Sequence, residues 1–222
     1  MRELTVEAAA NNAAWCDAVC SASGLRTRWG ADAWTVDRRS PDGYPDVVTL
    51  TDQVDVRALL SRVQLGAGCS VKDSFGVLDL EPWGFRLLFG ASWVRRSAAR
   101  AVDPAELAWH QVQTPTELVL WSEEHGLDVF RPALLEREDL RFFRSDPAVA
   151  AGFALNRTGS VVGVSNTHPG RASPAMVWAD QVAVAADTYP GLDLVGYEQG
   201  DDLDVALAAG FVATGPLRVW IS

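Results

Sequence analysis

The stretch that decides the fold runs from Asp193 to Ile221 and reads DLVGYEQGDDLDVALAAGFVATGPLRVWI. Its first six residues, Asp193–Glu198, are mostly apolar and predict a short buried strand. Asp201–Ala209 begins with two aspartates and continues with apolar residues at helical spacing, which predicts a helix that Gly210 ends. Leu217–Ile221 predicts a closing strand. The segment therefore has the order strand, helix, strand.

Working outward, the region from residue 107 onward continues this pattern. Thr114, Pro115 and Glu117 form the sequence signature of a helix start, with a cap, a proline in the first turn and an acid three residues after the cap. Asn156–Gly159 is a turn signal between two alternating stretches. The other elements that we predict here are a strand over Leu107–Gln113, a short helix over Leu134–Phe142, a hairpin of Ala150–Leu155 with Val161–Ser165, and a helix over Ala175–Thr188.

Residues 1–106 predict a second α+β region. Asn11 and Asn12 predict the cap of a helix over Ala13–Ser23. The segment Arg26–Tyr44 is rich in Trp and Arg without periodicity, so we expect an ordered loop that lines a pocket. The other predicted elements are a strand over Asp46–Leu50, a helix capped by Asp52 or Asp55 that runs to Val63, a hairpin of Phe75–Leu80 with Phe85–Val94, and a linker over Ser97–Asp103.

The order strand, helix, Gly-Phe, strand after Asp193 resembles the end of the GNAT fold, the fold of the acyl-coenzyme A N-acyltransferases. The resemblance implies an α+β protein with a GNAT-like mixed sheet flanked by helices over residues 107–222. Residues 1–106 would precede it as an N-terminal α+β region, either a second, incomplete GNAT-like copy or an unrelated cap. The resemblance also implies a cleft between splayed strands, with acyl-coenzyme A as co-substrate.

Charge and composition narrow the classes of partner. The formal net charge is −10, and residues 107–222 carry 7 basic against 15 acidic residues, so we expect no nucleic-acid binding. No apolar run reaches the ~20 residues of a membrane helix, and no secretory leader pattern is present. Three cysteines make no disulfide framework and lack zinc-ligand spacing. We expect a cytoplasmic protein with a small-molecule ligand and no metal.

In GNAT enzymes a loop of the pattern Gln/Arg-x-x-Gly-x-Gly/Ala holds the pyrophosphate of the cofactor. Glycines let backbone N–H groups approach the phosphates, and the helix N-terminus favours negative charge. The equivalent span here, Val164–Trp178, lacks that pattern, and Gly170-Arg171-Ala172-Ser173 is its nearest substitute. By the resemblance, the cofactor-binding residues would be Val164, Ser165, Asn166, Gly170 and Arg171. We expect acetyl-coenzyme A to bind weakly or not at all.

Three residues are candidates for catalysis. Tyr197 and Glu198 end a predicted strand beside the implied cleft, where a tyrosine could protonate a leaving thiolate and a glutamate could accept a proton from an amine. The alternative is that Tyr197 packs its ring while Glu198 faces solvent. His168 ends the neighbouring predicted strand and is the histidine best placed for acid–base work, although a histidine before a proline is often simply exposed.

A second candidate site is the glycine-flanked stretch Gly66–Asp73, which holds Cys69, Ser70 and Lys72, the chain's single lysine. A cysteine or serine nucleophile with a neighbouring base is one interpretation, and a turn with a buried cysteine is the other. Over the whole chain we expect an N-acyltransferase-like protein that moves an acyl group from acyl-coenzyme A to a small amine. The alternative is a noncatalytic ligand-binding or interaction protein on a degenerate GNAT scaffold.

Overall fold

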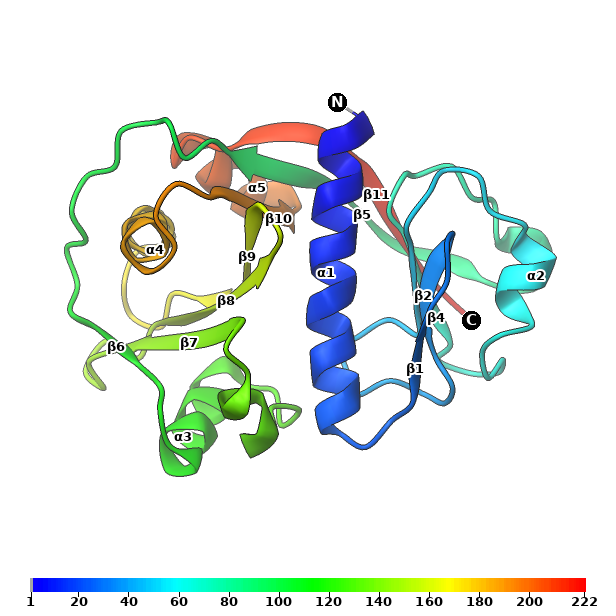
Figure 1. Ribbon diagram of the computed structural model, residues 1–222, viewed down its shortest axis with the longest axis horizontal. Helices are drawn as coiled ribbons and strands as arrows, with labels where there is room; N and C mark the ends of the chain where they lie inside the picture. The colour runs from blue at the N-terminus through cyan, green and yellow to red at the C-terminus, as the bar shows by residue number, and fades with distance from the viewer. Residues whose placement is uncertain (1) are drawn as a thin grey trace.

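The computed structural model describes residues 2–222, which form a single 11-stranded mixed sheet with helices packed against it (Figure 1). The mixed sheet flanked by helices that the sequence predicts is confirmed. The elements of the first half are α1 (Arg2–Ala22), β1 (Thr27–Trp29), β2 (Ala33–Val36), β3 (Val47–Thr49), α2 (Val56–Leu60), β4 (Ser70–Asp73), the 3-10 turn η1 (Glu81–Trp83) and β5 (Arg86–Arg96). Those of the second half are β6 (Trp109–Gln111), α3 (Pro115–His125), η2 (Pro132–Glu136), β7 (Leu140–Ser145), β8 (Gly152–Thr158), β9 (Val161–His168), α4 (Pro174–Thr188), β10 (Asp193–Glu198), α5 (Gly200–Ala208) and β11 (Val212–Ile221).

The pairing pattern repeats on the two sides of the sheet. The strand order is β1-β2-β3-β4-β11-β5-β10-β9-β8-β7-β6. In the first half, β1, β2 and β3 pair antiparallel in turn, and β3 then pairs parallel with β4. In the second half, β7, β8 and β9 pair antiparallel in turn, and β9 then pairs parallel with β10. Each parallel pair is joined by a helical crossover, α2 in one half and α4 in the other.

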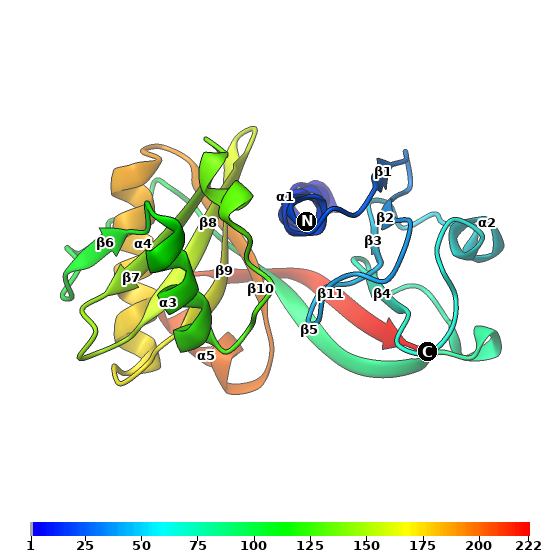
Figure 2. The same cartoon turned by 90° about the horizontal axis from the view of Figure 1, so that it is seen from below.

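The two halves are joined at the centre by exchanged strands. β5 lies between β10 and β11, and β11 lies between β5 and β4, with antiparallel pairing throughout. Figure 2 shows both long strands passing beneath α1 from one half to the other. β5 belongs to residues 1–106 by sequence, yet its neighbours on both edges come from residues 107–222. The division into domains 1–106 and 107–222 stays a prediction.

Helix α1 runs between the two halves (Figure 1). It begins at Arg2, so the prediction that Asn11 and Asn12 cap a helix from Ala13 is wrong. Both asparagines lie within the helix because their amides have tertiary partners. Asn11 Nδ2 donates to the Asn156 carbonyl at 2.9 Å, and Asn156 Nδ2 donates back to the Asn11 carbonyl at 3.0 Å. These bonds fix α1 against β8.

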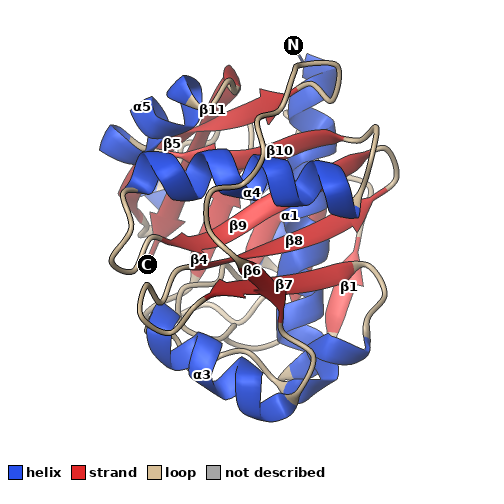
Figure 3. Ribbon diagram, turned by 90° about the vertical axis from the view of Figure 1, so that its left-hand side faces the viewer, coloured by secondary structure: helices blue, strands red, loops and turns tan. Residues whose placement is uncertain are grey.

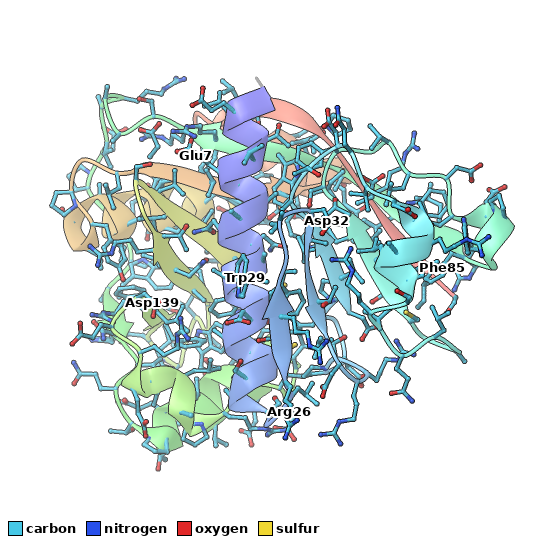
Figure 4. All side chains as sticks on the ribbon, turned by 45° about the vertical axis from the view of Figure 1, so that its right-hand side comes forward. Glu7, Arg26, Trp29, Asp32, Phe85 and Asp139 are labelled. Atoms are coloured by element: carbon cyan, nitrogen blue, oxygen red, sulfur yellow. The ribbon has the colours of Figure 1, made fainter. Side chains whose placement is uncertain are left out.

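The N-terminal end of α1 is held by charge. Glu7, labelled in Figure 4 near the start of the helix, accepts from Arg95 Nη1 at 2.5 Å. Arg95 lies on β5 and also donates Nε to Asp193 at 2.9 Å. One arginine therefore links α1, β5 and β10. Because the arginine side chain is only 15% exposed, the ion pairs are better shielded from solvent than ordinary surface pairs.

Most predicted elements of the second half are confirmed. β10 has the predicted bounds, α4 and α5 are present, and Thr114 with Glu117 forms a capping box at α3. The helix predicted over Leu134–Phe142 is wrong, because that span holds the turn η2 and the start of β7. The side chains of Phe142 and Phe143 enter the cores on opposite faces of the sheet. A strand buried on both faces lacks the alternation that separates strand from helix.

Two predictions for the first half are also corrected. Arg26–Tyr44 is not a loop throughout, because β1 and β2 form a hairpin within it. Residues 75–80 form no strand, so the hairpin predicted between them and Phe85–Val94 is absent. The apolar alternation of Phe85–Val94 correctly indicated a strand, but the two partners of this strand, β10 and β11, are distant in the sequence. A local alternation of apolar residues cannot identify such partners.

The helices cover both faces of the second half. Figure 3 shows α4 lying across the strands on one face and α3 below them. α4 contributes Trp178 and Val182 to one core, while α3 contributes Leu118 and Trp121 to the other. No helix in residues 2–222 has both the length and the apolar character needed to cross a membrane.

Candidate functional site

The strands β9 and β10 diverge at the centre of the second half. Their parallel pairing covers only Asp193–Val195 against Val161–Gly163. Beyond it, residues 164–168 of β9 and 196–198 of β10 have no pairing with each other. Gly196 marks the point of divergence, where a Cβ atom would lie 3.1 Å from the Val164 carbonyl oxygen. The gap between splayed strands that the resemblance implies is therefore present.

A bulge in β9 contributes to the splay. Ala154 of β8 lies opposite Ser165, whereas Gly152 lies opposite His168, so β9 has one more residue than β8 over this interval. Asn166 falls inside it with a φ of 54°, a left-handed conformation that asparagine tolerates better than most residues. Its side-chain oxygen accepts from the Tyr44 hydroxyl at 3.4 Å. The bulge is thereby tied to the first half of the chain.

A cavity of about 260 Å³, here called the central cavity, opens onto the diverging strands. Its walls come from both halves of the chain. Residues of α1 and β4 face residues of β9 and β10 across it. Its lining residues include Asn12, Trp15, Tyr44, Lys72, Trp93, Asn156, Val164, Ser165, Asn166, Tyr197 and Glu198.

Tyr197 stands in the wall of the central cavity. Its ring packs edge-on against Trp93, with ring centroids 5.6 Å apart. Lys72 Nζ lies over the same ring, 4.0 Å from its centroid. The Tyr197 ring is therefore packed against neighbouring side chains. The residue also lines the central cavity.

Glu198 lines the same cavity and is partly buried. Burial raises the pKa of its carboxyl to about 8, and the nearby Asp202 adds to that rise. A carboxyl with this pKa exchanges a proton near neutral pH, as a general base must. The role of Glu198 beside a ligand stays a prediction. Tyr197 and Glu198 both line the central cavity at the divergence, and Glu198 also lines a shallow groove with Gln199 and Leu203, because neighbouring residues alternate faces along a strand.

His168 is not brought to them. It does not line the central cavity but packs against Trp121 and His125, with ring centroids 5.4 and 5.3 Å away. Burial lowers the pKa of His125 to about 4, with the neighbouring His168 as a second cause, and burial also lowers the pKa of His168. His168 Nε2 and His125 Nδ1 are buried without a hydrogen-bond partner among the described residues. The two histidines form a neutral aromatic cluster with Trp121.

The candidate cofactor residues separate into two groups. Val164, Ser165 and Asn166 line the central cavity, whereas Gly170 and Arg171 do not. Arg171 donates its backbone N–H to the Val149 carbonyl and its Nη1 to the Ala148 carbonyl, both at 2.8 Å. A Cβ atom at Gly170 would lie 2.2 Å from the Val149 carbonyl oxygen, so packing accounts for this glycine.

The N-terminus of α4 offers little to a phosphate. Pro174 occupies the first turn and has no N–H, and the Met176 N–H is taken by the Ser173 hydroxyl at 3.2 Å. The Ala172 N–H is taken by the Pro169 carbonyl at 2.9 Å. A pyrophosphate cradle needs several free N–H groups at this position. The residues present do not fit that mode of binding.

The second candidate stretch, Gly66–Asp73, is divided between core and cavity. Cys69 is fully buried, and burial raises the pKa of its thiol, which disfavours the thiolate that a nucleophile requires. Asp73 accepts the N–H groups of Phe75 and Leu78 at 3.2 and 2.8 Å and closes a turn. Ser70 and Lys72 instead face a second cavity of about 440 Å³, here called the side cavity.

Lys72 and Asn12 were not among the sequence-predicted site residues of the cleft. Lys72 is 4% exposed and donates to Asn12 Oδ1 at 2.9 Å. The only available signal was that Lys72 is the single lysine of the chain and stands in a predicted glycine-flanked site. Among residues 2–222, no cluster of three or more side chains has the composition and geometry of a metal site.

Comparison with solved structures identifies the fold. A GCN5-related N-acetyltransferase from Kribbella flavida matches 97% of this chain and 95% of its own, with a TM-score of 0.59 and 14% identity. A putative GNAT-family acetyltransferase from Novosphingobium aromaticivorans matches 93% of this chain and 96% of its own, with a TM-score of 0.56 and 12% identity. The chain therefore has a GNAT-type fold. No family model and no curated protein sequence matches it.

Proposed function

We propose that this protein is an N-acyltransferase-like enzyme that moves an acyl group from acyl-coenzyme A to the amine of a small molecule. The observation that carries the proposal is the divergence of β9 and β10 directly beside Tyr197 and Glu198. The fold supports it, because the similar solved structures include GNAT acetyltransferases. Reaction would take place in the central cavity.

Each residue has a role that its environment supports. Glu198 takes the proton from the attacking amine, and its raised pKa makes it a stronger base than an ordinary carboxylate. Tyr197 donates a proton to the departing thiolate. On the side that faces β10, where Val164–Asn166 has no pairing partner, its backbone provides hydrogen-bonding groups along an extended arm of the donor. Since the α4 N-terminus does not fit a pyrophosphate, the donor is held mainly through that arm.

A direct test is to offer acetyl-coenzyme A and a panel of small amines to the protein. Acyl transfer is measured as the release of the free thiol of coenzyme A. We expect Glu198→Gln to lower kcat/KM by about 10²–10⁴, the range for loss of a general base. Because the base must lose its proton, the rate should rise with pH and level off above about pH 8. Glu123→Gln, an exposed change on α3, is the matched control. A Glu198→Gln enzyme with full activity and an unchanged pH profile would remove Glu198 from the mechanism.

The second candidate function is noncatalytic ligand binding on the same scaffold. The occupied N–H groups before α4 favour it, because they leave the pyrophosphate without its usual partners. Loss of two hydrogen bonds to a charged group costs about 3–6 kcal/mol. Calorimetric titration separates the two functions. Micromolar binding of acetyl-coenzyme A favours the enzyme, whereas no binding together with ligand capture by the central cavity favours the alternative.

We also infer that residues 1–106 are a second, reduced GNAT-like copy rather than an unrelated cap. The same succession of two antiparallel pairs and one parallel pair with a helical crossover supports this inference. So does the exchange of β5 and β11, since each follows the parallel pair of its own half. Superposition of Ala33–Asp73 on the matching strands of the second half tests it. Strands that fail to coincide in order and direction would overturn it.

A further inference from the structure

Lys72 is the single lysine of the chain. Lys72 lies on β4 and is 4% exposed. Along this short strand, Val71 and Asp73 face the core on one side, while Ser70 and Lys72 face the side cavity. Lys72 lines the central cavity as well. Its ammonium group is therefore held at the boundary between two cavities.

The contacts of the ammonium group leave its charge uncompensated. Nζ donates to Asn12 Oδ1 at 2.9 Å and lies 4.0 Å from the centre of the Tyr197 ring. No carboxylate among the described residues forms an ion pair with it. An amide oxygen and a ring face are weak partners for a cation out of water, and a buried charge without a counter-ion is costly. Two of the three ammonium protons remain for another acceptor.

Within residues 2–222, the central cavity has no acid other than Glu198, and the exposed Asp42, which lines the side cavity, forms no ion pair with Lys72. Of the residues that line the central cavity, only Lys72 and Glu198 are formally charged, and the raised pKa of Glu198 keeps its carboxyl largely neutral at pH 7. In the side cavity, Arg39 is already paired with Asp46. In a chain with a net charge of −10, the cavity thus contains a local positive charge. A fixed positive charge in a partly enclosed, neutral site favours an anion.

We propose that the central cavity binds a small molecule that carries a carboxylate, and that this carboxylate pairs with the ammonium group of Lys72. Asn12 holds Nζ in place from the α1 side, and Tyr197 holds it from the β10 side. Trp15, Tyr44, Trp93 and Tyr197 also line the cavity, so the body of the ligand is apolar and suits an aromatic ring. The inference rests on the proposed function only for the other end of the ligand, which would be the amine facing Glu198.

The first experiment compares two probes of equal shape by calorimetric titration. 4-(Aminomethyl)benzoate carries the carboxylate, and 4-(aminomethyl)benzamide replaces it with a neutral amide. Hydrogen bonds to a charged group contribute about 1.5–3 kcal/mol, so we expect the benzoate to bind about 10- to 100-fold more tightly. Equal affinities of the wild-type protein for the two probes would overturn the proposal.

Two variants assign the effect to Lys72. Lys72→Met keeps the length of the side chain and removes the charge, so preference for the benzoate should vanish. Its melting temperature should stay the same or rise, because an unpaired buried charge is removed. Asn12→Asp places an internal carboxylate beside Nζ and should also abolish the preference without loss of stability. A preference that survives in either folded variant would contradict the assignment.

The outcomes for binding and catalysis are separable. Benzoate binding without acyl transfer to its amine would leave the carboxylate site standing and remove the proposed enzyme function. Acyl transfer to both probes with equal KM would support the enzyme and overturn the carboxylate site. Gln113→Ala, an exposed change before α3, is the control that should alter neither measurement.

Discussion

Each half of the sheet contains a parallel strand pair joined by a helix, but the two strands diverge only in the second half. In the first half, β3 and β4 have 3 and 4 residues and are joined by the 5-residue helix α2. In the second half, β9 and β10 have 8 and 6 residues and are joined by the 15-residue helix α4. β3 and β4 end almost where their pairing ends, whereas β9 and β10 continue past it. The cleft thus depends on unpaired strand length and a bulge, since both halves share the crossover.

The second strand of each parallel pair ends in an acidic residue, and the surroundings of these two carboxyl groups differ. Asp73 ends β4, and burial raises the pKa of its carboxyl, while the backbone N–H groups of Leu78, Phe75 and Gly76 counteract the rise. Glu198 ends β10, and burial raises its pKa with no such N–H groups to oppose it. The first carboxylate closes a turn. The second faces a cavity, so position in the strand alone does not determine the role.

The largest expected effect comes from breaking the contact of α1 with the second half. A Cβ atom at Gly163 on β9 would lie 2.0 Å from Asn11 Oδ1 and 2.3 Å from Asn156 Oδ1. Gly163→Ala should destabilise the fold by about 3–5 kcal/mol, because overpacking is added to the loss of buried hydrogen bonds. Urea denaturation measures the change. Gly90→Ala, where the nearest atom to a Cβ would be 3.8 Å away, should stay within about 0.5 kcal/mol.

The second half should also make the stability of the protein depend on pH, because all three histidines lie in it. The pKa of His125 falls from 6.5 to about 4 on folding, so its proton is bound more tightly by the unfolded chain. Stability should be constant above about pH 6.5 and fall between pH 6.5 and 4, by at most about 3 kcal/mol.

Denaturation curves at several pH values measure this dependence. His125→Phe keeps an aromatic ring beside Trp121 and should flatten the curve. If acid destabilises His125→Phe as much as wild type, His125 is not the cause. Hydrogen exchange should show the early opening in α3 and β9 rather than in β1–β4.

A third comparison tests the two strand-ending acids directly. Asp73→Asn should cost about 2 kcal/mol, because two backbone N–H groups lose a charged acceptor. Glu198→Gln should change stability by less than about 0.5 kcal/mol, since its carboxyl is already largely neutral at pH 7. Thermal unfolding of both variants in one buffer gives the answer. Equal losses would mean that Glu198 is as structural as Asp73.

The smallest predicted effect concerns the helix caps. Thr114 accepts the Glu117 N–H at 3.3 Å, and Glu117 accepts the Thr114 N–H at 3.0 Å. Thr114→Ala should therefore destabilise by about 1 kcal/mol. Thr116→Ala makes the same chemical change on the exposed side of α3, where no cap is lost, and should have little effect. A larger loss for Thr116→Ala than for Thr114→Ala would show that the capping box is not what holds α3.

The same contrast explains what could be predicted from the sequence. The second half has long elements with local signals, so the capping box of α3 and the bounds of β10 could be read directly. Tyr197 and Glu198 could be placed in the cleft because they end that strand. The central cavity could not be predicted in full, because Asn12 and Lys72 reach it through tertiary contacts. β5 was mispaired because both of its partners lie in the other half.

The exchange of β5 and β11 has a consequence for synthesis of the chain. When the ribosome has made Arg96, neither β10 nor β11 exists yet, so both edges of the longest strand lack their partners. Translation adds about 5–20 residues per second, so β5 waits for several seconds. Open strand edges are where nascent chains associate with one another. The sheet of the first half is therefore completed only after the second half has been synthesised. A chaperone that covers Arg86–Arg96 during that interval would raise the yield of folded protein.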